Sequence, residues 1–235
     1  MHIDEENIKN IIKQAKVEKR TSLTEIESKG ILKHSGIDIT EPFISRCRND
    51  AVSISISLGF PVVLKVVSPD IVHKSDTGGV ALSINTPEQV YQAYDRIIDT
   101  VKRRHQRADI EGISVQRQAE AGTEIIIGVT KDPQFGPAIM FGIGGIWVEL
   151  LNDVCFRIVP ITNQDAAEMI REVKGYRLLE GYRGRKTVDI PIIEKWLIQV
   201  SHLTEEIEEI KELDINPIYV YQKGAIAVDA RIILE

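Results

Sequence analysis

One segment of the chain couples an apolar run to a polar loop that ends in two glycines. Residues 61–67 are almost all apolar and rich in β-branched types, which predicts a strand covered on both faces. Lys65 interrupts this run, and a buried ammonium group needs an anion beside it. The loop offers donors or a nucleophile at Ser68, His73, Lys74, Ser75 and Thr77, and backbone N–H groups at Gly78 and Gly79. The segment therefore predicts a polyphosphate site, although a strand with a solvated lysine and an ordinary loop fits the same residues.

A second group of polar residues lies near the C-terminus. Asp214 and Asn216 are two apart, so on a strand they point to the same face. A hairpin that turns at Lys223-Gly224 would bring Asp229 close to them. Mg²⁺ prefers one or two carboxylates together with phosphate oxygens and water, so these residues predict a magnesium site. A polar strand with a turn-forming Asn-Pro is the alternative.

Acidic and amide side chains also flank two predicted neighbouring strands. Gln116 ends one strand and Glu124 begins the next, with Glu111 nearby. A segment that leaves one strand and enters another lines a cleft well, so we expect its backbone to face a purine edge while Glu124 takes a ribose hydroxyl. Residues 141–147 lack the third glycine and the helix of a dinucleotide fingerprint, and the chain has no Walker P-loop motif. A Rossmann site is therefore rejected.

The elements that must position these residues follow from hydrophobic periodicity and turn signals. Helices are predicted over 4–18, 22–34, 48–58, 86–107, 165–171 and 192–203, the second of them from a capping box formed by Ser22 and Glu25. Strands are predicted over 61–67, 80–84, 112–116, 123–130, 138–141, 155–159, 214–221 and 225–233, with a further extended segment over 147–151. Helix–strand units come first and a mostly antiparallel sheet second. The pattern predicts an α/β (α+β) body of two lobes with a cleft between them.

Composition limits the partners that the chain can have. Its 235 residues are 43% hydrophobic and 27% charged, and the net charge of -6 argues against nucleic acid. The basic run over 102–107 is interpreted as the solvated end of a helix rather than a binding patch. Cys47 and Cys155 are isolated, which supports neither a disulfide framework nor a zinc site. With a charged N-terminus and no long apolar run, we expect a soluble cytoplasmic protein that does not enter a membrane.

Five separated motifs carry a resemblance to a known family. They are Leu64 to Val80, Glu124 to Gly128, Phe141 to Asp153, Arg183 to Arg185, and Glu212 to Pro217 with Asp229 to Arg231. In this order they resemble the β subunits of ADP-forming acetyl-CoA synthetases, from about residue 22 to the C-terminus. The resemblance implies an ATP-grasp fold with a helical extension over residues 1–20, an N-terminal lobe over 21–110 and a C-terminal lobe over 111–235.

The resemblance also implies roles for single residues. It implies nucleotide contacts from Lys65, Ser75, Gly78, Gly79, Gln116 and Glu124, and Mg²⁺ ligands at Asn216 and Asp229 with Asp214 as a further oxygen. Lys65 would hold the α- and β-phosphates, and Gln116 and Glu124 would contact adenine and ribose. Gln116 stands where succinyl-CoA synthetases carry an acidic residue. His73 resembles a histidine that transiently carries the phosphoryl group, a role that suits a nucleophilic neutral imidazole beside Lys74 and Lys65.

The implied reaction is acyl-CoA + ADP + phosphate = acid + CoA + ATP, through a phosphohistidine relay to Mg-ADP. An α subunit would supply the CoA-binding domain and the first phosphohistidine, and the two subunits are expected to form an α2β2 heterotetramer. We expect little activity from this chain alone. The alternatives are the β subunit of a succinate-type CoA ligase, against which the His73-Lys74-Ser75 sequence speaks, and a non-catalytic nucleotide-sensing subunit.

Overall fold

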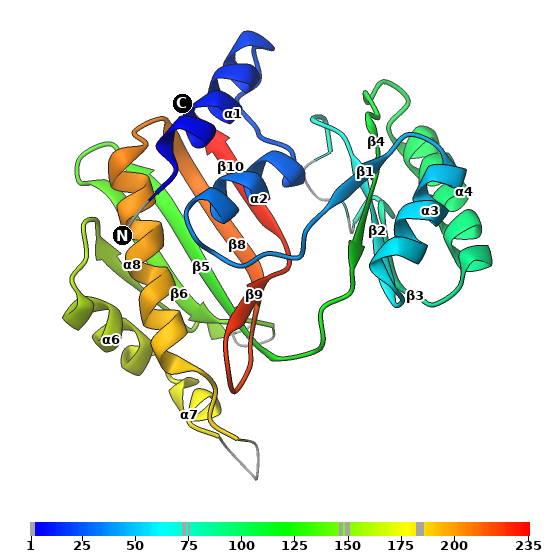
Figure 1. Ribbon diagram of the computed structural model, residues 1–235. Coiled ribbons are helices and arrows are strands. Elements are labelled where there is room, and N and C mark those ends of the chain that lie inside the picture. Colours follow the sequence, from blue (N-terminus) through cyan, green and yellow to red (C-terminus); the bar gives the residue numbers. More distant parts are fainter. Residues whose placement is uncertain (1–2, 72–73, 75, 146–147, 149–150, 182–185) are drawn as a thin grey trace. The chain divides into compact units, whose positions relative to one another are not determined.

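The computed structural model describes residues 3–71, 74, 76–145, 148, 151–181 and 186–235 (Figure 1). The chain divides into two compact units. One, the six-stranded unit, comprises the chain up to Leu23, Glu27–Ile39 and Glu120–Glu235; the other, the four-stranded unit, comprises Thr24–Ile26 and Thr40–Ala119. This division differs from the lobes expected over 21–110 and 111–235, because residues 27–39 group with the C-terminal part of the chain and the four-stranded unit continues to Ala119. The expected lobe boundaries stay a prediction.

The four-stranded unit is an antiparallel sheet in the order β1-β4-β2-β3 with two helices. Its elements are β1 (Phe43–Ser45), α3 (Arg48–Leu58), β2 (Val62–Val67), β3 (Val80–Ile84), α4 (Pro87–Arg104) and β4 (Gly112–Arg117). All six residues of β2 are buried, as its apolar run predicts. Thr86 caps α4 by accepting a hydrogen bond from the Gln89 N–H, and Pro87 fits the first turn because it has no N–H to satisfy.

The six-stranded unit holds the larger core. Its elements are α1 (Glu5–Val17), most of α2 (Glu25–His34), β5 (Thr123–Asp132), β6 (Gly136–Ile143), β7 (Val154–Ile158), α6 (Asn163–Glu172), α7 (Tyr176–Leu179), α8 (Ile190–Glu206), β8 (Ile210–Val220), β9 (Ala225–Ala227) and β10 (Ala230–Leu234). The antiparallel sheet runs β10-β8-β5-β6-β7, with β9 also paired to β8. Helices α6 and α8 cover one face of it (Figure 1). Alternate strand residues such as Ile125 and Ile127 point into this core, together with Trp196 of α8.

Several expected elements are confirmed, including α3, β3 and the C-terminal hairpin, in which β9 and β10 pair antiparallel to β8. The capping box is wrong: α2 begins at Glu25, and Ser22 instead forms a β-bridge with Ile233 beside β10. The extended segment over 147–151 is also wrong where it is described, because Val148 and Leu151 are helical. The short elements β1 and α7 were missed, since three or four residues carry little periodicity. In the described ranges no helix has the length and apolarity needed to cross a membrane.

Candidate functional site

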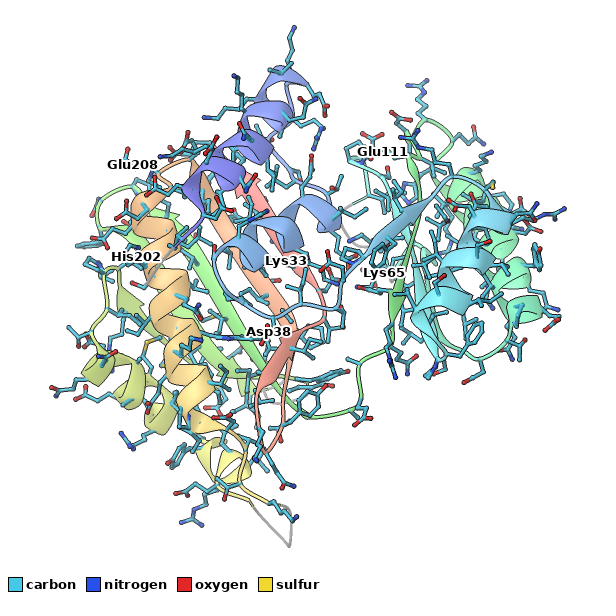
Figure 2. All side chains as sticks on the ribbon, in the orientation of Figure 1. Lys33, Asp38, Lys65, Glu111, His202 and Glu208 are labelled. Atoms are coloured by element: carbon cyan, nitrogen blue, oxygen red, sulfur yellow. The ribbon has the colours of Figure 1, made fainter. Side chains whose placement is uncertain are left out.

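Lys65 lies on β2 of the four-stranded unit and is buried, with 4% of its surface exposed (Figure 2). Its Nζ donates a hydrogen bond of 2.7 Å to Oε1 of Glu25, from the Thr24–Ile26 segment of the same unit. The Nζ of Lys74 lies 3.2 Å from the other carboxylate oxygen of Glu25, Oε2. One carboxylate therefore faces two ammonium groups. Charged donors of this type form the strong hydrogen bonds by which proteins recognise carboxylate and phosphate.

Gln116 belongs to this cluster as well. On β4 it lies opposite Val63 of β2, and only 1% of its surface is exposed. Its Nε2 lies 3.5 Å from Oε1 of Glu25, and its Oε1 accepts a hydrogen bond of 3.0 Å from Thr40 Oγ1. The structure thus brings Gln116 and Lys65 together on one carboxylate. The adenine contact expected of Gln116 stays a prediction.

The two loop glycines are required by the packing of the loop itself. Gly78 has φ +75, and a Cβ there would lie 2.9 Å from Thr100 Cγ2; at Gly79 it would lie 2.5 Å from Val66 Cγ1. The Gly79 N–H donates to the Lys74 carbonyl at 2.8 Å. Because this N–H is already bonded inside the loop, close packing accounts for both glycines without a ligand. Their phosphate contacts stay a prediction.

Two further hydrogen bonds stabilise the loop. Thr77 Oγ1 donates to the Lys74 carbonyl at 2.8 Å, and Arg104 Nη1 donates to the Asp76 carbonyl at 2.7 Å. The loop that carries Lys74 is therefore tied to α4. Two residues predicted for the site, His73 and Ser75, lie outside the described residues.

The predicted metal ligands lie together in the six-stranded unit. Asp214 of β8 is paired in register with Arg231 of β10, and the Asn216 N–H donates to the Asp229 carbonyl at 3.3 Å. Burial raises the pKa of the Asp214 carboxyl; the positive charge of Arg231 opposes this shift, and the negative charge of Asp229 adds to it. A cation beside Asp214 would stabilise the charged form of this carboxyl.

This donor set fits Mg²⁺ better than a closed transition-metal site. In the described part of the chain no three His, Cys, Asp or Glu side chains gather as a metal cluster. Two carboxylates and the Asn216 amide give instead the incomplete oxygen shell that Mg²⁺ accepts when phosphate and water complete it. The oxygen set that the sequence predicted at Asp214, Asn216 and Asp229 is therefore chemically suitable.

Glu124 lies on the same face of the six-stranded sheet as Asp214. Leu213 and Ile215 of β8 are buried in the core, so Asp214 between them points to the opposite face. On β5, Glu124 alternates with the core residue Ile125 and pairs in register with Tyr219. The predicted ribose contact, Glu124, and the predicted metal ligand Asp214 thus lie on the same face of the sheet, opposite the core that the helices cover.

Contacts around Glu124 hold its carboxylate beside a pair of glycines. Burial raises the pKa of the Tyr219 hydroxyl, and the charge of Glu124 and a hydrogen bond to it raise that pKa further. The Gly144 N–H donates to the Glu124 carbonyl at 2.8 Å, and a Cβ at Gly144 would lie 2.8 Å from Glu124 Cβ. Gly145 is also close, since a Cβ there would lie 3.3 Å from Glu124 Oε2. The glycines of the 141–153 motif thus allow the close approach of Glu124.

Sequence reasoning missed Glu25, the carboxylate on which Lys65, Lys74 and Gln116 converge. It treated Glu25 as part of a helix cap. Glu25 is 40 residues from Lys65 and 91 from Gln116, so no local spacing connects them. The only signal available was the lysine itself, because a buried ammonium requires an anion within the fold.

Comparisons with known proteins identify the family of this chain. A family model described as an ATP-grasp domain matches residues 14–234. Acetate–CoA ligase (ADP-forming) I subunit beta from Pyrococcus furiosus is 48% identical over 226 residues, covering 96% of this chain and 97% of that protein. Its name does not favour the succinate-type alternative.

Two solved structures of acetyl-coenzyme A synthetase 1 from Ca. Korarchaeum cryptofilum are also similar. One, in complex with coenzyme A, Ca-AMPCP and HgCl+, has a TM-score of 0.94 and 49% identity, covering 97% of this chain and 99% of that chain. The other, with coenzyme A and Mg-AMPPCP, has its phosphohistidine segment pointing towards the nucleotide binding site; its TM-score is 0.85, with 45% identity over 97% of this chain and 100% of that chain.

Proposed function

This chain belongs to the ATP-grasp domain family and, within it, to the β subunits of ADP-forming acetate–CoA ligases, and we propose that it is the nucleotide-binding subunit of such a ligase. The reaction is acyl-CoA + ADP + phosphate = acid + CoA + ATP. In it, phosphate displaces CoA from the thioester to give an acyl phosphate, and the phosphoryl group then passes by way of histidine to ADP. The name of the Pyrococcus furiosus relative supports acetate as the acid.

The observation that carries the proposal is the pair of ammonium groups on one buried carboxylate. Lys65 and Lys74 lie 2.7 and 3.2 Å from the oxygens of Glu25. In our proposal these ammonium groups bind phosphate oxygens of the nucleotide, with Ser75, Gly78 and Gly79 lining the phosphate chain. Charge-assisted hydrogen bonds of this kind are among the strongest available to a protein.

In our proposal Glu124 and Gln116 bind the nucleoside, and Asn216, Asp229 and Asp214 hold Mg²⁺. The metal, when bound, supplies positive charge to the phosphate oxygens. The oxygen-only donor set and the raised pKa of Asp214 support this assignment. A solved relative contains Mg-AMPPCP, which supports magnesium and an adenine nucleotide for this chain as well.

His73 is proposed as the phosphoryl carrier beside the nucleotide. Its imidazole nitrogen would attack phosphorus, forming an N–P bond as the bond to the donor breaks, and the β-phosphate oxygen of ADP would then take the group and restore neutral imidazole. Lys65 and Lys74 would balance the charge of the transferred group. The phosphohistidine segment of the Korarchaeum enzyme supports a histidine relay in this family.

A partner chain is part of the proposal, because the matched relative is named as a β subunit. We propose that an α subunit binds CoA and carries the first phosphohistidine, in an α2β2 assembly. This chain alone is then expected to bind Mg-ADP without turning over acyl-CoA.

Calorimetry on the full chain tests nucleotide binding. Titration with ADP in the presence of Mg²⁺ is expected to give a saturable heat, and no heat of association would refute the proposal. A second experiment tests the relay: label from γ-³²P-ATP is expected on this chain and absent from the His73→Asn variant. Label carried by the α subunit alone would remove His73 from the relay but leave nucleotide binding in place.

A further inference from the structure

The carboxylate of Glu25 faces several donors of the four-stranded unit. Lys65 donates to Oε1, the Gln116 amide approaches the same oxygen, and Lys74 lies beside Oε2. Thr40 donates to the carbonyl oxygen of Gln116 and so turns the amide nitrogen toward Glu25. The carboxylate thus receives ammonium and amide donors, which are the types of donor that also bind phosphate.

Burial makes this arrangement necessary when no ligand is bound. The side chains of Glu25 and Lys65 are 2% and 5% exposed, and that of Lys74 is 15% exposed. A buried ammonium group without an anion is strongly destabilising. Two of them close together would also repel each other. The Glu25 carboxylate lowers both penalties, because it contacts both ammonium groups.

The same carboxylate also opposes a nucleotide. In the proposed function, Lys65 and Lys74 contact Glu25 and phosphate oxygens at the same time, since each ammonium group has three donors. The phosphate is then held close to a like charge in a poorly screened environment. The attraction that the two lysines offer is therefore partly offset by Glu25.

We propose that Glu25 is a built-in counter-ion that takes the place of phosphate in the nucleotide-free protein and limits the affinity of the site for a nucleoside diphosphate or triphosphate. This inference rests on the proposed function, because it takes the ligand of Lys65 to be a nucleotide. Glu25 acts through the two lysines, so it is a positioning residue. By keeping the affinity moderate it allows the product nucleotide to leave.

Glu25→Gln tests the inference because it keeps the size of the side chain and removes its charge. Thermal unfolding and calorimetry of the full chain are measured with and without ADP and Mg²⁺. The nucleotide-free variant is expected to unfold at a lower temperature than the wild type. We expect the variant to bind Mg-ADP about tenfold more tightly, since one unfavourable close charge is removed, so that ADP raises its Tm by more than it raises that of the wild type.

Glu27→Gln is the matched control. Glu27 lies on the same helix, but its carboxylate pairs with Arg20, at 2.6 Å, in the six-stranded unit. We expect this variant to lose stability while its Kd for Mg-ADP stays at the wild-type value. A purely structural role of Glu25 at the start of α2 would give the same result for both variants.

Unchanged or weaker Mg-ADP binding by Glu25→Gln would overturn the inference. If the variant does not fold, Glu25→Gln is combined with Lys74→Gln, which removes one positive charge along with the negative one. Recovery of folding in the double variant supports the counter-ion role, and failure to recover refutes it. Absence of any Mg-ADP effect on the wild type would instead refute the proposed function, and this inference with it.

Discussion

Replacing Lys65 by methionine gives the most direct test of the phosphate site. The substitution keeps an unbranched side chain of similar length in β2, where Lys65 is 4% exposed, and removes the ammonium group with its charge and its hydrogen-bond donors. Glu25 then retains Lys74 at 3.2 Å as its ionic partner. Removing one partner of a buried pair costs about 3–5 kcal/mol, and the remaining lysine should reduce this to about 1–3 kcal/mol, or about 3–10 °C in Tm for a chain of this size.

The effect of Lys65→Met on nucleotide binding should exceed its effect on stability. A buried ammonium–phosphate contact is worth about 2–5 kcal/mol when one side is truncated, so we expect the Kd for Mg-ADP to rise at least about thirtyfold in calorimetry. Lys131→Met is the control, because Lys131 pairs with Glu235 at 3.2 Å in the six-stranded unit. Binding of Mg-ADP by Lys65→Met with unchanged affinity would refute the assignment of Lys65 to the phosphates.

Three further predictions concern other parts of the molecule. Burial and the charge of Asp229 raise the pKa of Asp214, so the charged carboxylate destabilises the folded state. Asp214→Asn should therefore raise the Tm of the metal-free protein at pH 7, and this difference in Tm should disappear below about pH 4, where Asp214 is protonated in both states. The same substitution should weaken Mg²⁺ binding. Gly79→Ala should cost about 1–3 kcal/mol in denaturant unfolding, since its Cβ would lie 2.5 Å from Val66 Cγ1, whereas Gly136→Ala, where nothing lies within 4 Å, should cost only the smaller strain of its φ of +77. Finally, Cys47 is exposed, while burial raises the pKa of Cys155 to about 11, so a thiol reagent at pH 8 should modify one cysteine in the native protein and two after unfolding; fast modification of both would contradict the buried position of Cys155.

Local patterns predicted well those features that local physics controls. The apolar run at β2, the caps of α4 and the Lys223-Gly224 hairpin each depend on residues within a few positions of one another. The hairpin also explains why Asp214 and Asp229 could be placed together. Pairing across a short connection fixes the register, and the register fixes which side chains meet.

The contacts of Glu25 could not be predicted from local patterns. Its partner Lys65 is 40 residues away. The rest of α2, the strand β1 and the helix α3 lie between them in the chain, and propensity alone does not predict how these elements assemble. The sequence nevertheless predicted an anion beside Lys65, because a lysine in the middle of a buried strand requires one. It could not tell whether that anion is a ligand or a side chain. The structure supplies the side chain, and the two ammonium groups that meet on this one carboxylate are the physical reason to propose a phosphate ligand as well.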